Sequence, residues 1–256
     1  MSVIRTDRWL AEAYDRPIEI CGKLTGLFDG AYASEIYDHL LLHGMYYPLP
    51  NGKEVIKKLQ ERNVWRMVGN EAEVLQELWE GPDIPIYIFP SDTSNTTMNL
   101  EFNGKSGLAF RDKLFLFISE ENDAAEIKSL LTHEYNHVCR LTHYPKHEGD
   151  YTLLDSIILE GLAEHAVRER FGEKHLSSWI SLYTDEELLK MWEAYIAPNR
   201  SILKTDRKHH QLMYGSPLYP KMAGYSVGYY LVGKYAATHF SSSKDMLSTV
   251  SCQFSP

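Results

Sequence analysis

The sequence has few cysteines, no long apolar run and no cluster of basic residues, and each shortage excludes a class of protein. Cys21, Cys139 and Cys252 are an odd number at wide spacing, which suits neither a disulfide framework nor a cysteine-rich zinc module. No apolar stretch approaches the roughly 18–20 residues that cross a membrane. The formal net charge of -9 and the scattered Lys and Arg residues argue against a nucleic-acid partner, because phosphate binding depends on clustered cations.

The N-terminal segment lacks the apolar core of a secretory signal. Arg5, Asp7, Arg8 and Glu12 lie within an amphipathic pattern there, whereas a signal peptide needs an uninterrupted apolar stretch. Reduced thiols are the simplest interpretation of the three widely spaced cysteines. These features predict a cytoplasmic protein that does not associate with a membrane.

Apolar periodicity predicts an α+β fold that is rich in helices. The 256 residues, 44% of them hydrophobic, are enough to bury a full core. From Asp7 to about Trp79 apolar residues recur at intervals of three and four, which indicates several short helices. Short β-rich runs then predict a small mixed sheet; they are Ile84–Phe89, Leu114–Ser119 and a glycine-flanked candidate edge strand, Gly107–Phe110.

Helical patterns return after the sheet. The predicted helices are residues 123–141, with Asn122 as a candidate N-cap, and residues 153–171, 185–194 and 226–238. A Ser-rich tail follows from Ser241, and we expect it to be mobile.

The helix over residues 123–141 carries the sequence His133-Glu134-Tyr135-Asn136-His137. Histidines four residues apart lie about one helical turn apart on the same face, so both imidazoles can reach one ion. Zinc binds neutral imidazole, and a catalytic zinc site uses three protein ligands and leaves the fourth position for water. Glu134 is then the neighbour that could deprotonate that water. The alternative is a helix surface that carries two histidines and an acid by chance.

Two residues compete to be the third ligand. His143 has the spacing of a three-histidine site of the metzincin type, but that pattern needs glycine where this chain has Arg140. Arg in the left-handed backbone of that turn would cost on the order of 1 kcal/mol or more. Without that role, His143 is an exposed polar residue.

Glu160 is the other candidate, because it lies in an apolar helix with Glu164 four residues later. This spacing resembles the gluzincin arrangement, in which the first acid binds zinc and the second would accept a hydrogen bond from the outer nitrogen of a ligating histidine, here His133. The apolar neighbours of Glu160 favour burial, and a buried carboxylate without a cation is costly. The alternative is a solvated helix face with acids at ordinary spacing.

Three motifs together resemble the YjaZ-like bacterial family of predicted zinc-dependent proteases. They are the segments beginning at His133 (HEYNHVCRL), Leu153 (LLDSIILEGLAEH) and Gly224 (GYSVGYY), and the resemblance covers about residues 84–240. The resemblance implies His133, His137 and Glu160 as zinc ligands. It implies a reaction class without a defined natural substrate, and it leaves the helical front section outside.

The Gly224–Tyr230 segment also supplies phenols four residues apart, at Tyr225 and Tyr229. Either hydroxyl could donate a hydrogen bond to the oxyanion that forms during peptide hydrolysis, and Tyr225, near a helix start, is our choice. The alternative is an aromatic stripe that packs on neighbouring helices.

These observations predict a zinc-dependent peptidase with two parts. Residues 1–82 form a helical N-terminal section, and residues 83–256 form a zincin-like metallopeptidase domain packed with it. Zinc would supply Lewis acidity, Glu134 would act as general base, and the partner would be a peptide or protein substrate. The alternatives are a metal-binding protein without turnover and a regulatory protein that retains a degenerate site. Sequence alone gives neither cleavage specificity nor oligomeric state.

Overall fold

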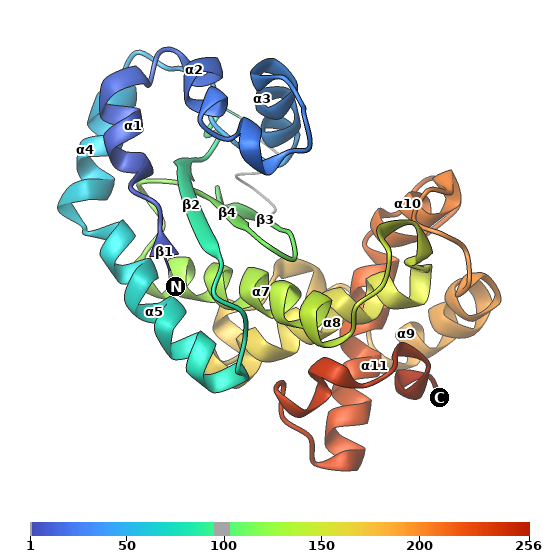
Figure 1. Cartoon of the computed structure of the whole chain (residues 1–256). Helices are drawn as coiled ribbons and strands as arrows, with labels where there is room; N and C mark the ends of the chain where they lie inside the picture. Colours follow the sequence, from blue (N-terminus) through green and yellow to red (C-terminus); the bar gives the residue numbers. More distant parts are fainter. Residues whose placement is uncertain (1, 95–102) are drawn as a thin grey trace. The chain divides into compact units, whose positions relative to one another are not determined.

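A computed structural model describes residues 2–94 and 103–256 of the chain, which divide into two compact units (Figure 1). The first unit is Met1–Tyr135 and the second is Asn136–Pro256. The boundary falls inside one continuous helix, α7 (Ala124–His143). The sequence-based division at residues 82 and 83 stays a prediction.

The first unit contains a four-stranded mixed sheet in the order β1-β2-β4-β3. Its strands are β1 (Ser2–Val3), β2 (Pro85–Pro90), β3 (Ser106–Ala109) and β4 (Leu114–Ile118). β1, β2 and β4 run parallel, and β3 pairs antiparallel with β4 as an edge strand. Every residue of β4 is buried, which explains its unbroken run of Leu, Phe and Ile. The predicted helix-rich α+β fold with a small mixed sheet is confirmed; β1 had not been predicted.

Short amphipathic helices surround this sheet in the first unit. They are α1 (Thr6–Ala13), α2 (Pro17–Gly22), α3 (Ala33–Leu42), α4 (Gly52–Glu61) and α5 (Val64–Trp79). Figure 1 shows α2 and α3 on one side of the sheet and α7 on the other. Tyr135 of α7 stacks on Trp79, with ring centroids 6.1 Å apart, and donates a hydrogen bond to the backbone oxygen of Pro82. These contacts hold the first half of α7 against α5 and the segment that follows it.

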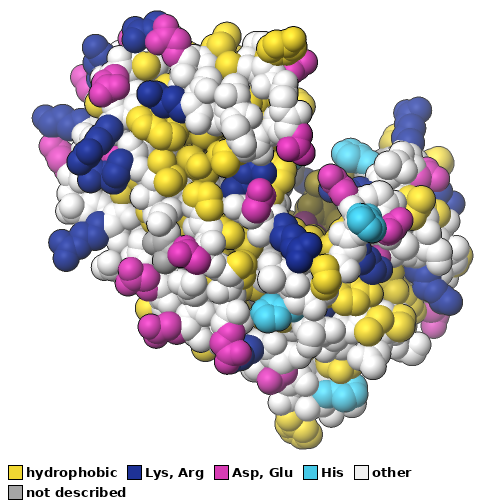
Figure 2. All heavy atoms as spheres, in the orientation of Figure 1, with side chains coloured by type: hydrophobic (Ala, Val, Ile, Leu, Met, Phe, Trp, Pro, Cys, Tyr) yellow, Lys and Arg dark blue, Asp and Glu magenta, His cyan; other side chains and the backbone are white. Residues whose placement is uncertain are grey.

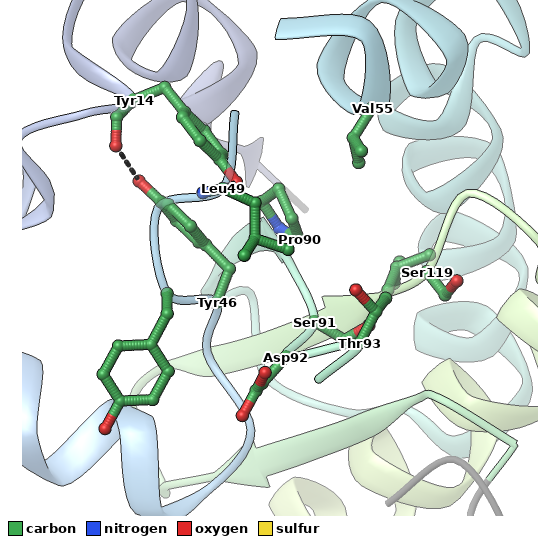
Figure 3. A pocket seen from close by; sticks show the side chains of 11 residues that line it. Tyr14, Tyr46, Leu49, Val55, Pro90, Ser91, Asp92, Thr93 and Ser119 are labelled. Carbon is green, nitrogen blue, oxygen red and sulfur yellow. Dashed lines mark hydrogen bonds between the residues drawn. The ribbon is translucent and has the colours of Figure 1, made fainter. Parts of the chain in front are cut away.

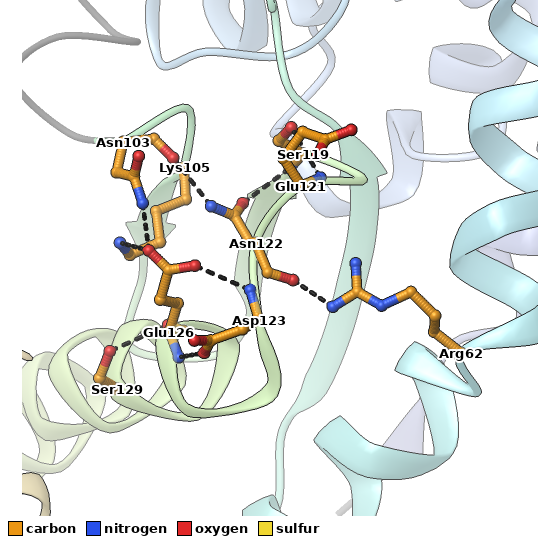
Figure 4. A network of polar contacts seen from close by, with 9 residues as sticks. All are labelled: Arg62, Asn103, Lys105, Ser119, Glu121, Asn122, Asp123, Glu126 and Ser129. Atoms are coloured by element: carbon orange, nitrogen blue, oxygen red, sulfur yellow. Dashed lines mark hydrogen bonds and ion pairs between the residues drawn. The ribbon is translucent and has the colours of Figure 1, made fainter.

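The start of α7 differs from the prediction, because Asp123 rather than Asn122 caps the helix (Figure 4). Asp123 Oδ1 accepts from the Glu126 backbone N–H at 2.8 Å, and Glu126 Oε2 accepts from the Asp123 N–H at 2.7 Å. This is a reciprocal capping box. Asn122 instead accepts from the Ser119 N–H at 2.9 Å and donates to the Asn103 carbonyl at 2.8 Å. Asn122 therefore ties the loop between β4 and α7 to the segment that leads into β3.

The second unit is helical. Its helices are α8 (Leu153–Phe171), α9 (Asp185–Met191), α10 (Arg207–Tyr214) and α11 (Ala223–His239), and the sequence had not predicted α10. Thr152 and Asp155 form a capping box that begins α8 at the predicted residue. α8 and α11 form the centre of an apolar core that includes Ile157, Leu162 and Val227.

The C-terminal segment is packed, so the expectation of a mobile tail is wrong. Two short 3₁₀ helices, Asp245–Ser248 and Ser251–Phe254, bury Met246, Leu247 and Phe254. Arg140 of α7, only 3% exposed, donates to the backbone oxygen of Leu247 at 2.7 Å and to Ser251 Oγ at 3.3 Å. A guanidinium bonded in this way anchors the Ser-rich segment, which composition alone does not reveal.

The surface in Figure 2 shows basic and acidic side chains interspersed over the visible face. In the described part of the chain, no helix has the length and apolar character needed to span a membrane. The absence of a nucleic-acid partner stays a prediction.

Candidate metal centre

The structure brings His133, His137 and Glu160 together. One ligand atom from each residue can be chosen so that all three lie within 4.8 Å of one another. His133 and Glu160 are half-buried and His137 is buried. Within residues 2–94 and 103–256, this is the one group of three or more His, Cys, Asp or Glu side chains with such spacing.

The spacing of this group fits zinc. Tetrahedral zinc with bonds of about 2.0–2.1 Å separates two ligand atoms by about 3.3–3.4 Å. His137 Nε2 and Glu160 Oε2 lie 3.6 Å apart, close to that separation. Two imidazoles and one carboxylate are also a donor set found in catalytic zinc sites. The three side chains therefore fit the metal after small side-chain adjustments.

Glu160 is positioned by a close crossing of α8 and α11. A Cβ atom built on the next residue, Gly161, would lie 2.3 Å from the Gly228 backbone oxygen. A Cβ on Gly228 would lie 1.9 Å from the Ile157 backbone oxygen. The backbones approach this closely only because both residues lack side chains. The turn of α8 that carries Glu160 is thus fixed by backbone contact with α11.

The structure does not bring His143 into the group. α7 continues without a break to His143, its last residue, and this histidine is exposed. Arg140, which stands where the three-histidine pattern needs glycine, is helical and bonded to the C-terminal segment. The chain therefore makes no sharp turn that would bring His143 back to the other two histidines.

Glu134, which lies between the two histidines, is only 8% exposed and rests against strand β3. A Cβ atom built on Gly107 would lie 2.4 Å from Glu134 Cγ and 2.5 Å from Cδ. The Glu134 side chain therefore occupies the space that a side chain at position 107 would fill.

Glu164 is nearly fully buried, at 2% exposure. Its carboxylate accepts a hydrogen bond from Ser177 Oγ at 2.5 Å and one from the Ser177 backbone N–H at 3.3 Å. These bonds explain how a buried acid is stabilised in this helix. The hydrogen bond expected between Glu164 and His133 stays a prediction.

Tyr225 lies in the first turn of α11, and its hydroxyl donates to the Tyr214 hydroxyl at 3.0 Å. Its ring also packs edge-on against Trp179. The pKa of Tyr214 is raised above its usual value, mainly by partial burial; the hydrogen bond from Tyr225 opposes this rise and the charge of Glu160 adds to it. Sequence reasoning missed Tyr214, which ends the unpredicted helix α10.

Tyr229, the second candidate from the sequence, has a different neighbour. Burial raises the pKa of Tyr229, while the adjacent Arg168 guanidinium and its hydrogen bond lower it. Tyr229 therefore interacts with a cation on α8, and Tyr225 interacts with a second phenol.

A separate small pocket lies at the carboxyl ends of β2 and β4 (Figure 3). Stacked Tyr14 and Tyr46 form one wall, and the buried Ser91 and the segment after Ile118 form another. Tyr46 donates to the Tyr14 backbone oxygen at 3.1 Å, which fixes the aromatic wall. None of the lining residues belongs to the metal group.

Comparison with known proteins adds independent findings. A family model described as "Predicted Zn-dependent protease" matches residues 64–254. The uncharacterized protein YjaZ of Bacillus subtilis (strain 168) is 43% identical over 251 residues, which cover 97% of this chain and 96% of that relative. The uncharacterized protein YjfC of the same organism is 28% identical over 123 residues, which cover 44% of this chain and 40% of that relative. No solved structure matches the chain.

These matches extend further than the motifs alone indicated. The family model begins at residue 64, inside α5, and the similarity to YjaZ includes nearly the whole helical front section. The range matched by the family model contains His133, His137 and Glu160, and it also contains the hydrogen-bonded pair Tyr214 and Tyr225.

Proposed function

The chain belongs to the family of predicted zinc-dependent proteases, and from this we propose that it hydrolyses peptide bonds at a gluzincin-type centre formed by His133, His137 and Glu160. The observation that carries the proposal is the convergence of these three side chains, with Glu134 between the two histidines. Intact Glu134 favours turnover over storage or regulation, because metal binding alone does not require it.

Zinc held there would supply Lewis acidity, which polarises a carbonyl and lowers the pKa of water to about 7. Glu134 would take the proton of the attacking water and pass it to the leaving amine. Because its side chain is confined against β3, the carboxylate is held in place before the reaction begins. His133 and His137, one turn apart on α7, keep their relative positions through the helix backbone.

A phenol would stabilise the charge that develops on the substrate carbonyl oxygen. Tyr225 is the predicted donor, and its hydrogen bond to Tyr214 makes the two hydroxyls a pair. We propose that this pair supplies the donor: the Tyr214 hydroxyl, which accepts from Tyr225 and keeps its own proton to donate, faces the substrate, and Tyr225 orients it.

The free edge of β3 is a suitable binding site for an extended peptide. Phe110 N–H donates to the Lys113 oxygen at 2.9 Å, so these two residues form a hydrogen-bonded pair at the hairpin end. Because such pairs alternate along an antiparallel ladder, the backbone groups of Gly107 and Ala109 point away from β4. Among the described residues, no strand pairs with that edge. A peptide added there would lie beside Glu134.

The cellular setting follows from the thiols. Cys21 and Cys139 are buried, Cys252 is exposed, and no disulfide joins them in the structure. Unlinked cysteines are typical of a reducing compartment, so we propose that the protein acts in the cytoplasm on a peptide or protein substrate.

Metal analysis combined with turnover tests this function. The purified protein should contain about one zinc per chain. Glu160→Ala should lower zinc content far more than His143→Ala, its matched control. Glu134→Gln should keep the zinc and the fold but lose about 10²–10⁴-fold in turnover of a responsive peptide, because the amide cannot accept a proton.

Each competing function gives a different result. Zinc without hydrolysis of any member of a peptide library would favour a metal-binding protein without turnover. Absence of metal after gentle purification would favour a regulatory protein with a degenerate site. A larger loss of zinc from His143→Ala than from Glu160→Ala would overturn the ligand set.

A further inference from the structure

We propose that Gly107 is a positioning residue for the general base: its missing side chain creates the space in which the Glu134 carboxylate is held. The inference rests on the proposed role of Glu134. It concerns two residues of the same compact unit, one on edge strand β3 and the other on helix α7.

The Glu134 side chain fills the space beside Gly107. The ideal Cβ position of Gly107 lies 2.4 Å from Glu134 Cγ, 2.5 Å from Cδ and 2.7 Å from Oε1. Cδ and Oε1 belong to the carboxyl group, and Cγ is the methylene that carries it. Any residue other than glycine at position 107 would therefore overlap the carboxylate group and its adjoining methylene.

Strand β3 is held more firmly than the Glu134 side chain. Four consecutive residues of β3 pair with the fully buried strand β4, and Ser106 Oγ donates to the His43 backbone oxygen at 2.7 Å. A packed side chain adjusts to an added atom by changes in its own torsions, whereas a strand paired along its length moves only together with its neighbour. An added methyl group should thus move the carboxylate and leave the strand in place.

Gly107 has two roles: its backbone is part of the free edge of β3, and its lack of a side chain makes room for Glu134. Its backbone polar groups point to the free edge of β3, and its Cα faces Glu134. Because Gly107 has no side chain, the Glu134 carboxylate can lie directly beside the edge of β3 at which an extended peptide would bind. No positive φ is recorded for Gly107, so the requirement for glycine comes from the contact and not from backbone conformation.

Gly107→Ala tests the inference, with Gly69→Ala as the matched control. A Cβ on Gly69, in helix α5, would meet only Val3 Cγ2 at an ordinary 3.6 Å. Gly107→Ala should keep zinc content and KM but lower kcat by about 10²-fold or more, approaching the loss in Glu134→Gln. Gly69→Ala should leave zinc content, KM and kcat unchanged. In a Glu134→Gln background, Gly107→Ala should cause little further loss of kcat.

A stability cycle provides a readout that does not depend on activity. Glu134→Ala removes the atoms that the new methyl group would meet, so Gly107→Ala should lower Tm in the wild-type background and not in Glu134→Ala. This comparison remains informative if the single Gly107→Ala variant is too unstable to assay, because the double variant should then recover its fold.

Three outcomes would overturn the inference. The first is wild-type turnover in a folded Gly107→Ala enzyme. The second is an equal loss of Tm when Gly107→Ala is introduced into the wild type and into Glu134→Ala. The third is that Gly107→Ala lowers kcat as much in the Glu134→Gln background as in the wild type. If the wild-type protein hydrolyses no peptide, the proposed function fails instead, while the stability cycle still tests the contact.

Discussion

Replacing Gly228 with alanine tests the helix crossing that positions Glu160. The new Cβ would lie 1.9 Å from the Ile157 backbone oxygen and 2.7 Å from the Ile157 carbonyl carbon. An ordinary contact between carbon and oxygen is about 3.3–3.6 Å. α8 and α11 would therefore have to separate locally by about 1.5 Å, because neither the methyl group nor the carbonyl can rotate away.

The expected cost follows from two opposing effects. Overpacking of this kind destabilises a core by about 1–3 kcal/mol, and a contact with rigid backbone belongs at the upper end. Alanine in place of glycine inside a helix contributes about 1 kcal/mol in the other direction. The free energy of unfolding should therefore fall by about 2 kcal/mol, which corresponds to a decrease in Tm of roughly 4–8 °C for a protein of this size.

Gly233→Ala, in the same helix, provides the control. A Cβ on Gly233 would have no neighbour within 4 Å, so this variant should gain up to about 1 kcal/mol from helix propensity alone. Thermal unfolding followed by circular dichroism measures both variants, and zinc content should fall in Gly228→Ala only. If Gly228→Ala melts as high as Gly233→Ala, the close crossing does not position Glu160 as argued.

Two further predictions concern the second unit. Tyr214→Phe and Tyr225→Phe should each keep the zinc content and Tm of the wild type but lower kcat by about 10²-fold. The kcat of Tyr229→Phe should stay near that of the wild type. Normal turnover in the first two variants would mean that Tyr214 and Tyr225 have packing roles only. Burial would raise the pKa of Asp155, but hydrogen bonds from Lys146, Thr152 and Ser251 outweigh it and hold the pKa below its usual value. The stability that Asp155 contributes is therefore present at neutral pH and lost as pH falls through the lowered pKa. Asp155→Asn should reduce Tm at neutral pH and flatten its decrease in acid, and an unchanged acid profile would contradict this account.

The parts of the site that sequence predicts are those determined by local spacing. His133 and His137 lie four residues apart on one helix, and the bounds of α8 (Leu153–Phe171) match the prediction because its capping box and apolar period are both local. Helix α10 was missed because its sequence, RKHHQLMY, is too polar and short to give a clear period, and Tyr214 was missed with it. The packed tail was missed because its anchor, Arg140, lies more than 100 residues away along the chain.

Both acids of the proposed centre depend on glycines that the motifs do not mark as functional. Gly107 leaves the space that Glu134 occupies, and the Gly161–Gly228 crossing fixes the turn that carries Glu160. In each case the added Cβ would be less than 3 Å from its neighbour, so the glycine is required by packing and not by backbone conformation. A motif search that records only histidines and acids captures the groups that would bind metal and move protons. The placement of these groups depends on glycines, whose packing role becomes visible only in the folded structure.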